Sequence, residues 1–205
     1  KEVATAFDNH VREQLPWYDL ASDLTCHLIK SYIPENGLFY DLGCSTGNIT
    51  KRCRDFLLER NVNCTSVDNS EEMGELFTGV GKFENHNLCQ FHAKEYDVAV
   101  MFLSLMFVPV YRREYLIGQM ISKQRRGGAL IIVDKFTPAD GYLSKSISRM
   151  TFLNKLNQGC PKEEVIEKEM SLVGVQRPCS FDLFEKFERW FQVGEFIGYI
   201  YCRED

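Results

Sequence analysis

The sequence predicts an α/β protein with a mostly parallel seven-stranded sheet, helices on both faces and a C-terminal antiparallel strand. Three observations predict this fold. Short apolar runs alternate with amphipathic helical segments, which is typical of a parallel sheet. A glycine-containing loop follows the first apolar run. Residues 183–202 contain two runs of bulky apolar and aromatic side chains, which favour a final antiparallel pair.

Local patterns justify the elements one by one. Ser70 is a predicted N-cap because its hydroxyl can accept a backbone N–H three residues on. Gly127 and Gly128 are predicted to end the helix before them. In order, the predicted elements are a helix over 9–33 broken at Pro16, a strand over 38–42, a helix over 46–60, a strand over 64–67, a helix from Ser70, a weaker strand within 83–91, a strand over 97–103, a helix over 112–126, a strand over 129–133, helices near 141–158 and 161–170, and two strands within 183–202.

Composition restricts the class of protein. A length of 205 residues predicts one domain, and 44% hydrophobic with 26% charged residues is ordinary for a globular chain. A net charge of −5 argues against a broad nucleic-acid surface. No apolar stretch reaches the roughly 20 residues that a membrane span needs. Eight dispersed cysteines without a C-x-x-C pair predict reduced thiols in a cytoplasmic protein and no metal site.

The loop after the first predicted strand carries the functional prediction. It reads Asp41-Leu42-Gly43-Cys44-Ser45-Thr46-Gly47, so its glycines are spaced G-x-x-x-G and not G-x-G-x-x-G. The Asp41 carboxylate would repel a pyrophosphate and suits a cationic ligand. Asp68, about twenty residues later, ends the second strand, where an acid can accept both ribose hydroxyls. Loop and acid together predict S-adenosylmethionine as the cofactor.

These residues resemble motif I of the class I S-adenosylmethionine-dependent methyltransferases, a Rossmann-like fold. The closer resemblance is to the carboxy-S-adenosylmethionine synthase family, which serves tRNA wobble-uridine modification. The matching pieces run almost end to end. They are Phe7-Asp8, Val11, Pro16-Trp17-Tyr18, residues 40–45, Asp68-Asn69-Ser70 with Met73, residues 127–130, Lys135-Phe136 and Trp190-Phe191-Gln192.

The resemblance implies one cofactor-binding domain over 1–205, with an N-terminal helical lid (1–33), a helical insertion near the substrate pocket (137–170) and a homodimer. It implies that Tyr18 closes over the methionine end of the cofactor and that residues 43–45 hold its carboxylate and amine. Asp68 would bind the ribose, with Asn69 beside the adenine and Asn87 near the adenine amino group. The full implied cofactor-binding set is Tyr18, Asp41, Gly43, Cys44, Ser45, Gly47, Asp68, Asn69, Asn87 and Leu88.

One departure from the family pattern bears on the reaction. The synthases bind the extra carboxylate of their cofactor through an Arg that follows a Lys on a late helix, whereas Glu169 follows Lys168 here. A carboxylate at this place would repel that group, so plain methyl transfer is favoured. The candidate substrate contacts are Lys135, Arg177, Trp190 and Gln192.

Three functions stay open. The leading one is methyl transfer to a small-molecule or tRNA-linked acceptor. The second is a carboxy-S-adenosylmethionine synthase that uses prephenate. The third is a non-catalytic S-adenosylmethionine-binding module that acts through a partner protein. Transfer from a sulfonium needs no fixed protein nucleophile, so the sequence assigns no catalytic residue.

Overall fold

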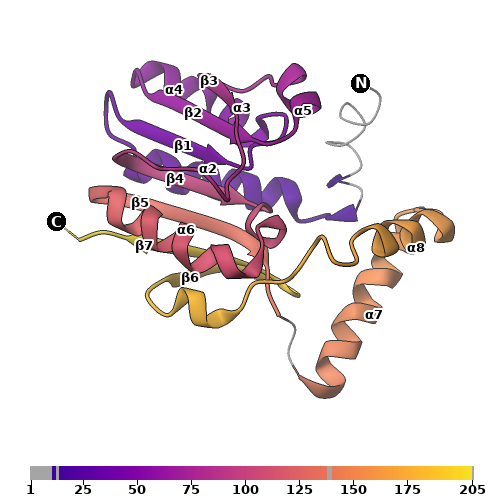
Figure 1. The fold of residues 1–205 in the computed structure, drawn as a ribbon. Coiled ribbons are helices and arrows are strands. Elements are labelled where there is room, and N and C mark those ends of the chain that lie inside the picture. The colour runs from indigo at the N-terminus through magenta and orange to yellow at the C-terminus, as the bar shows by residue number, and fades with distance from the viewer. Residues whose placement is uncertain (1–10, 13, 138–139, 205) are drawn as a thin grey trace.

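The computed structural model describes residues 11, 12, 14–137 and 140–204, so the Phe7-Asp8 piece and the first part of the expected lid lie outside the described residues. A single seven-stranded sheet runs through the molecule (Figure 1). Its strands are β1 (Leu38–Leu42), β2 (Asn63–Asp68), β3 (Lys82–Asn85), β4 (Tyr96–Phe102), β5 (Gln124–Lys135), β6 (Glu188–Val193) and β7 (Phe196–Cys202).

The strand order is β3-β2-β1-β4-β5-β7-β6. The first five strands pair in parallel, and β7 is antiparallel to both β5 and β6. The chain moves outward from β1 to β3 and then returns to the other side of β1. This reversal creates a switch point between β1 and β4, at whose carboxyl ends α/β proteins bind ligands. The predicted fold class is confirmed.

Helices cover both faces of the sheet. The α-helices are α2 (Tyr18–Tyr32), α3 (Asn48–Arg52), α4 (Arg54–Glu59), α5 (Glu71–Glu75), α6 (Val110–Lys123), α7 (Gly141–Asn157) and α8 (Lys162–Ser171), and short 3-10 turns are η1 (Leu105–Phe107) and η2 (Phe181–Phe184). None of the helices in the described ranges has the length and apolar character that a bilayer span requires.

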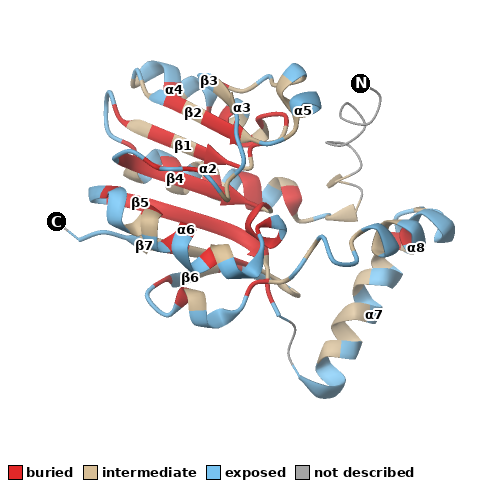
Figure 2. Ribbon diagram, in the orientation of Figure 1, coloured by how far each residue is buried: buried red, intermediate tan, exposed pale blue. Residues whose placement is uncertain are grey.

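The two faces of β4 explain the layering. All seven of its residues are buried (Figure 2). From Val98 to Phe102, successive side chains enter opposite cores. Val98 and Val100 pack into the core under α2, α3 and α4, while Ala99 and Met101 pack into the core under α6 and η2. A strand buried on both sides needs a continuous apolar run, which the sequence supplies.

Helices α7 and α8 stand apart from the sheet as a separate arm (Figure 1). Few of their residues are buried, and the exceptions are Lys155 on α7 and Val165 on α8. The arm begins after β5, so it emerges at the carboxyl edge of the sheet, the same edge as the switch point.

Two element predictions differ from the structure. The helix predicted over 46–60 is interrupted at Cys53, which separates α3 from α4. The helix predicted to end at Gly127 ends at Lys123 instead, and residues 124–128 already belong to β5. The predicted N-cap is confirmed, because the Ser70 hydroxyl accepts the Met73 N–H at 3.2 Å.

Candidate functional site

A cavity of about 430 Å³ opens at the carboxyl ends of β1, β2 and β4. It therefore lies at the switch point of the strand order. Its lining residues are Gly43, Ser45, Asp68, Asn69, Ser70, Met73, His86, Asn87, Leu88, Cys89, Leu103, Ser104, Phe107, Val108 and Pro109. We call it the strand-end cavity.

The loop after β1 turns sharply to form one wall of this cavity. Gly43, Ser45 and Gly47 all have positive φ, at 78°, 49° and 86°. A Cβ at Gly43 would lie 2.3 Å from the Cβ of Ser104, so only glycine fits there. The Ser104 hydroxyl donates to the carbonyl of Leu42 at 2.7 Å, which joins the ends of β1 and β4.

Asp68 holds the loop against the end of β2. Its two carboxylate oxygens accept the backbone N–H groups of Ser45, at 2.8 Å, and of Ser70, at 3.0 Å. The Ser45 N–H is thereby engaged within the protein. Asp68 still lines the cavity, so its carboxylate faces the space in which a ligand would lie.

Asp41 is a buried carboxyl group one strand away. Its side chain is fully buried, and Oδ2 has no hydrogen-bond partner among the described residues. Burial, together with the negative charge of Asp68, raises the pKa of Asp41 to about 7. Neither carboxyl group has a cationic partner in the described part of the chain. The ends of β1 and β2 thus hold two carboxyl groups without a cation beside them.

The structure brings six of the ten predicted cofactor residues to this cavity. These are Gly43, Ser45, Asp68, Asn69, Asn87 and Leu88. The Asn87 side-chain oxygen accepts the Cys89 N–H at 2.8 Å, so its capacity to accept from a ligand is already partly used.

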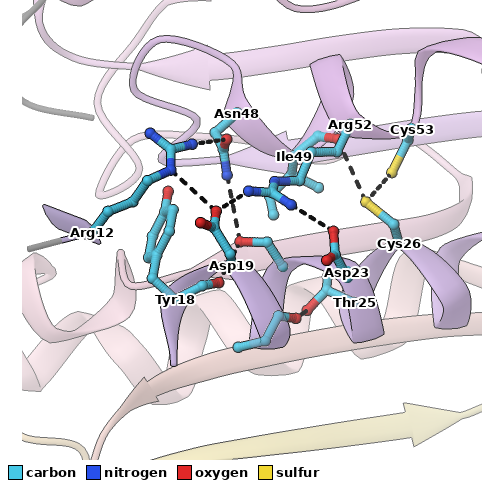
Figure 3. A network of polar contacts seen from close by, with 12 residues as sticks. Arg12, Tyr18, Asp19, Asp23, Thr25, Cys26, Asn48, Ile49, Arg52 and Cys53 are labelled. Carbon is cyan, nitrogen blue, oxygen red and sulfur yellow. Dashed lines mark hydrogen bonds and ion pairs between the residues drawn. The ribbon is translucent and has the colours of Figure 1, made fainter. Parts of the chain in front are cut away.

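The other four predicted residues lie behind the cavity wall. Asp41 and Cys44 are buried, and Gly47 packs against Phe77 and Gly79. The ring of Tyr18 packs edge-on against Phe102, 5.5 Å between centroids, with the Arg12 guanidinium over its face (Figure 3).

Sequence reasoning missed much of the wall that follows β4. Leu103, Ser104, Phe107, Val108 and Pro109 all line the cavity. These residues directly follow β4, a strand at the switch point, and this position could have indicated that they line the ligand site. Ser70 and Met73, which belong to one of the pieces that match the family, also line it, whereas no local pattern distinguishes His86 and Cys89 from surface residues.

A second cavity of about 160 Å³ shares Leu103 and Phe107 with the first. We call it the arm cavity, because residues of α7 and α8 form one side of it. Its lining residues are Val11, Gln14, Leu15, Leu103, Met106, Phe107, Lys135, Thr151, Lys155, Lys168, Glu169, Leu172, Gln176, Glu195 and Phe196.

Charged side chains on the arm cavity are arranged as pairs. Lys155 Nζ lies 3.1 Å from Glu169 Oε1. Lys135 Nζ lies 3.6 Å from Glu195 Oε2 and 3.4 Å from the Gln176 side-chain oxygen. Lys168 adds a further positive charge to the wall.

The remaining substrate candidates lie elsewhere. Arg177 is exposed and lines neither cavity, although its backbone carbonyl accepts from Arg113 at 2.8 Å. Trp190 packs on Phe191, and Gln192 is exposed and bonded to Arg189. Of the four substrate candidates, Lys135 alone lines the strand-end cavity or the arm cavity. Within the described ranges, no group of three His, Cys, Asp or Glu side chains could hold a metal ion.

Comparison with known proteins places the chain near one enzyme family. It is 26% identical over 98% of its length to the carboxy-S-adenosyl-L-methionine synthase of Staphylococcus epidermidis, covering 93% of that protein. It is 28% identical over 97% of its length to the enzyme of the same name from Campylobacter jejuni, covering 92%. No protein-family model matches the chain.

Solved structures give the fold. A S-adenosylmethionine-dependent methyltransferase from Clostridium acetobutylicum superposes with a TM-score of 0.57 at 12% identity, over 98% of this chain and 99% of that one. An O-methyltransferase family protein from Burkholderia thailandensis gives 0.59 at 18%, over 98% of this chain and 60% of that one. The chain therefore has the fold of the class I S-adenosylmethionine-dependent methyltransferases and is similar, along nearly its whole length, to the carboxy-S-adenosyl-L-methionine synthases.

Proposed function

We propose that this protein binds S-adenosylmethionine in the strand-end cavity and transfers its methyl group to a small acceptor in the arm cavity. The observation that carries the proposal is the pair of carboxyl groups, Asp41 and Asp68, at the ends of adjacent strands without a cation of their own. A ligand that carries an ammonium and a sulfonium group supplies the missing positive charge.

Each part of the cavity suits a part of this cofactor. Asp68 lines the cavity, and each of its oxygens, which accepts one backbone N–H, retains a lone pair that can accept a ribose hydroxyl. Asn69, Asn87 and Leu88 lie on the side where the adenine would follow the ribose. Gly43 and Ser45, on the loop side, would hold the amino-acid end, because glycine allows close approach of the backbone there.

When bound, the cofactor supplies an electrophilic methyl group, and the protein's task is to position the acceptor in line and exclude water. Leu103 and Phe107 separate the two cavities and line both, so they mark the place where cofactor and acceptor would meet. Their apolar side chains provide the low-dielectric surroundings that favour neutralisation of the sulfonium charge.

The volume of the arm cavity favours a compact acceptor. About 160 Å³ has room for a small molecule or for one extruded group of a larger one, such as a base of tRNA. The two ion pairs on its wall, Lys155 with Glu169 and Lys135 with Glu195, have polar atoms that can orient such a group. We also propose that residues 1–33 form a lid over the cofactor, that the protein is a homodimer and that it is located in the cytoplasm.

The curated relatives favour a second candidate, a carboxy-S-adenosyl-L-methionine synthase that would use prephenate. That product carries an additional carboxylate beside the sulfonium. No arginine lines either cavity among the described residues, and the lysines Lys155 and Lys135 on the arm cavity are already paired with Glu169 and Glu195. These two features weigh against the synthase reaction and toward methyl transfer.

A calorimetric titration tests the proposal. We expect S-adenosylmethionine and its demethylated product to bind, and the carboxylated cofactor to bind at least tenfold more weakly. Preferred binding of the carboxylated form would support the synthase. Tight binding of S-adenosylmethionine without turnover of any offered acceptor would support a non-catalytic module.

A further inference from the structure

Helix α2 is joined to α3 by a row of polar contacts on the face of the sheet opposite α6 (Figure 3). Arg52 pairs with both Asp19 and Asp23. Asn48 accepts from Arg12 at 3.2 Å and donates to the Ser22 hydroxyl at 3.4 Å. The row ends in two cysteines, which the proposed function does not use.

The two sulfur atoms are in direct contact. The Cys53 thiol donates to Cys26 Sγ at 2.7 Å, and the Cys26 thiol donates to the carbonyl of Ile49 at 3.8 Å. A disulfide bond measures about 2.05 Å, so little displacement separates this contact from a covalent bond. All eight cysteines are free, and among the described residues this is the one pair of thiols bonded to each other.

The two thiols differ in their access to solvent. Cys26 is half-buried, while Cys53 is completely buried. The hydrogen bond with Cys26 and burial raise the pKa of Cys53, which therefore stays a thiol at neutral pH. An oxidant in solution reaches Cys26 first, and Cys53 is placed to react with the product.

We propose that Cys26 and Cys53 form an intramolecular disulfide when the protein meets hydrogen peroxide. The Cys26 sulfur attacks the peroxide, the O–O bond breaks, and a sulfenic acid and one water form. The Cys53 sulfur then attacks the Cys26 sulfur, the S–O bond breaks, and the departing hydroxide takes the Cys53 proton as a second water. The bond ties α2 to the junction of α3 and α4 and prevents further oxidation of Cys26.

Peptide mapping tests this directly and does not depend on the cofactor proposal. After treatment with hydrogen peroxide and alkylation of free thiols, trypsin should release peptide 13–30 joined to dipeptide 53–54, two hydrogens lighter than the sum. Dithiothreitol should separate them. Oxidised protein should unfold about 5–10 °C higher than reduced protein, because the bond restricts the unfolded chain.

Three variants complete the test. In Cys53→Ala, Cys26 should advance to sulfinic acid and no linked peptide should appear. Cys26→Ala should likewise give no linked peptide, whereas Cys202→Ser, which removes an exposed and distant thiol, should retain it. Sulfinic acid at Cys26 of the unmodified protein, or a link from Cys26 to another cysteine, would overturn the proposal.

Discussion

Lys155 and Glu169 form an ion pair between α7 and α8, with Nζ 3.1 Å from Oε1, on the wall of the arm cavity. The lysine side chain is 8% exposed and the glutamate 32%. The pair therefore has two consequences. It holds the two helices of the arm together, and it engages one of the three lysines on the wall of the arm cavity.

Glu169→Gln should reduce the free energy of unfolding by about 1–2 kcal/mol, because it leaves the buried ammonium of Lys155 without its counter-charge. Urea unfolding measures this. Glu84→Gln removes half of an exposed pair with Lys82 and should cost less than about 0.5 kcal/mol. Equal costs for the two variants would show that the arm pair contributes no more than a surface contact.

Asp68→Ala should weaken binding of S-adenosylmethionine by on the order of 2 kcal/mol, roughly 30-fold, since charge-assisted hydrogen bonds to the ribose are lost. Calorimetry measures the affinity. Thermal unfolding checks that the domain stays folded without the hydrogen bonds that Asp68 accepts from Ser45 and Ser70. Asp55→Ala, an exposed acid on α4, is the matched control and should bind as the unmodified protein does. Unchanged affinity in Asp68→Ala removes the ribose assignment.

The free energy of unfolding should fall as the pH rises from about 4 to about 7, because of the raised pKa of Asp41. Its pKa is raised from 3.8 to about 7 in the folded state, so the folded protein holds a proton that the unfolded chain releases over this range. The stability from this proton is complete below pH 3.8 and is lost by about pH 7, at most about 4 kcal/mol.

The variant Asp41→Asn isolates this effect from other titrating groups. Unfolding free energies at pH 5 and pH 8 should differ less in the variant than in the unmodified protein. Saturating S-adenosylmethionine should also reduce the pH dependence, because a bound cation compensates the ionised carboxyl group. Identical pH profiles for variant and unmodified protein would contradict the pKa of about 7.

Arg113 is buried and fixes the wall that follows β4. Its guanidinium donates to the backbone carbonyls of Met106, Val108, Arg177 and Pro178, at 2.8–3.1 Å. Arg113→Lys should cost about 3 kcal/mol or more in urea unfolding, because one ammonium cannot reproduce the planar fork. Arg126→Lys, at an exposed position, should be neutral. Full stability of Arg113→Lys would show that the carbonyls find other donors.

Much of the fold could be predicted from local patterns. The apolar runs in β4 and in the second half of β5 are buried on both faces, and those in β1 and β2 contain buried and half-buried residues. Such runs are visible in a single sequence. The glycine loop and Asp68 could also be recognised, because each is marked by a short motif in the sequence. The features that could not be predicted depend on contacts between segments far apart in the sequence.

Gly128 illustrates why the end of the helix before β5 could not be predicted. A Cβ at this position would lie 2.1 Å from the carbonyl oxygen of Asp97, so the glycine serves the close approach of β5 to β4. The helix-ending role predicted for it depended only on its neighbours in sequence. The register between the two strands shifts at the same place, from Tyr96 opposite Gln124 to Val98 opposite Ala129. A tertiary contact of this kind leaves no local signal.

Trp190 shows the same limit among the predicted substrate contacts. Its ring covers Gly198 on the neighbouring strand, where a Cβ would approach within 2.7 Å of the indole. Strand pairing between β6 and β7 therefore accounts for the aromatic residue. The contact of Cys26 with Cys53 also joins segments that no sequence pattern connects.

The most direct measurement is mass spectrometry of the small molecule released when the purified protein is denatured. We expect S-adenosylmethionine or its demethylated product, because Asp68 on the wall of the strand-end cavity and the buried Asp41 behind it have no cation of their own, and no arginine lines the described part of the arm cavity. Release of the carboxylated cofactor would contradict the assignment of methyl transfer. A protein that releases nothing and fails to bind added S-adenosylmethionine would contradict the cofactor site itself.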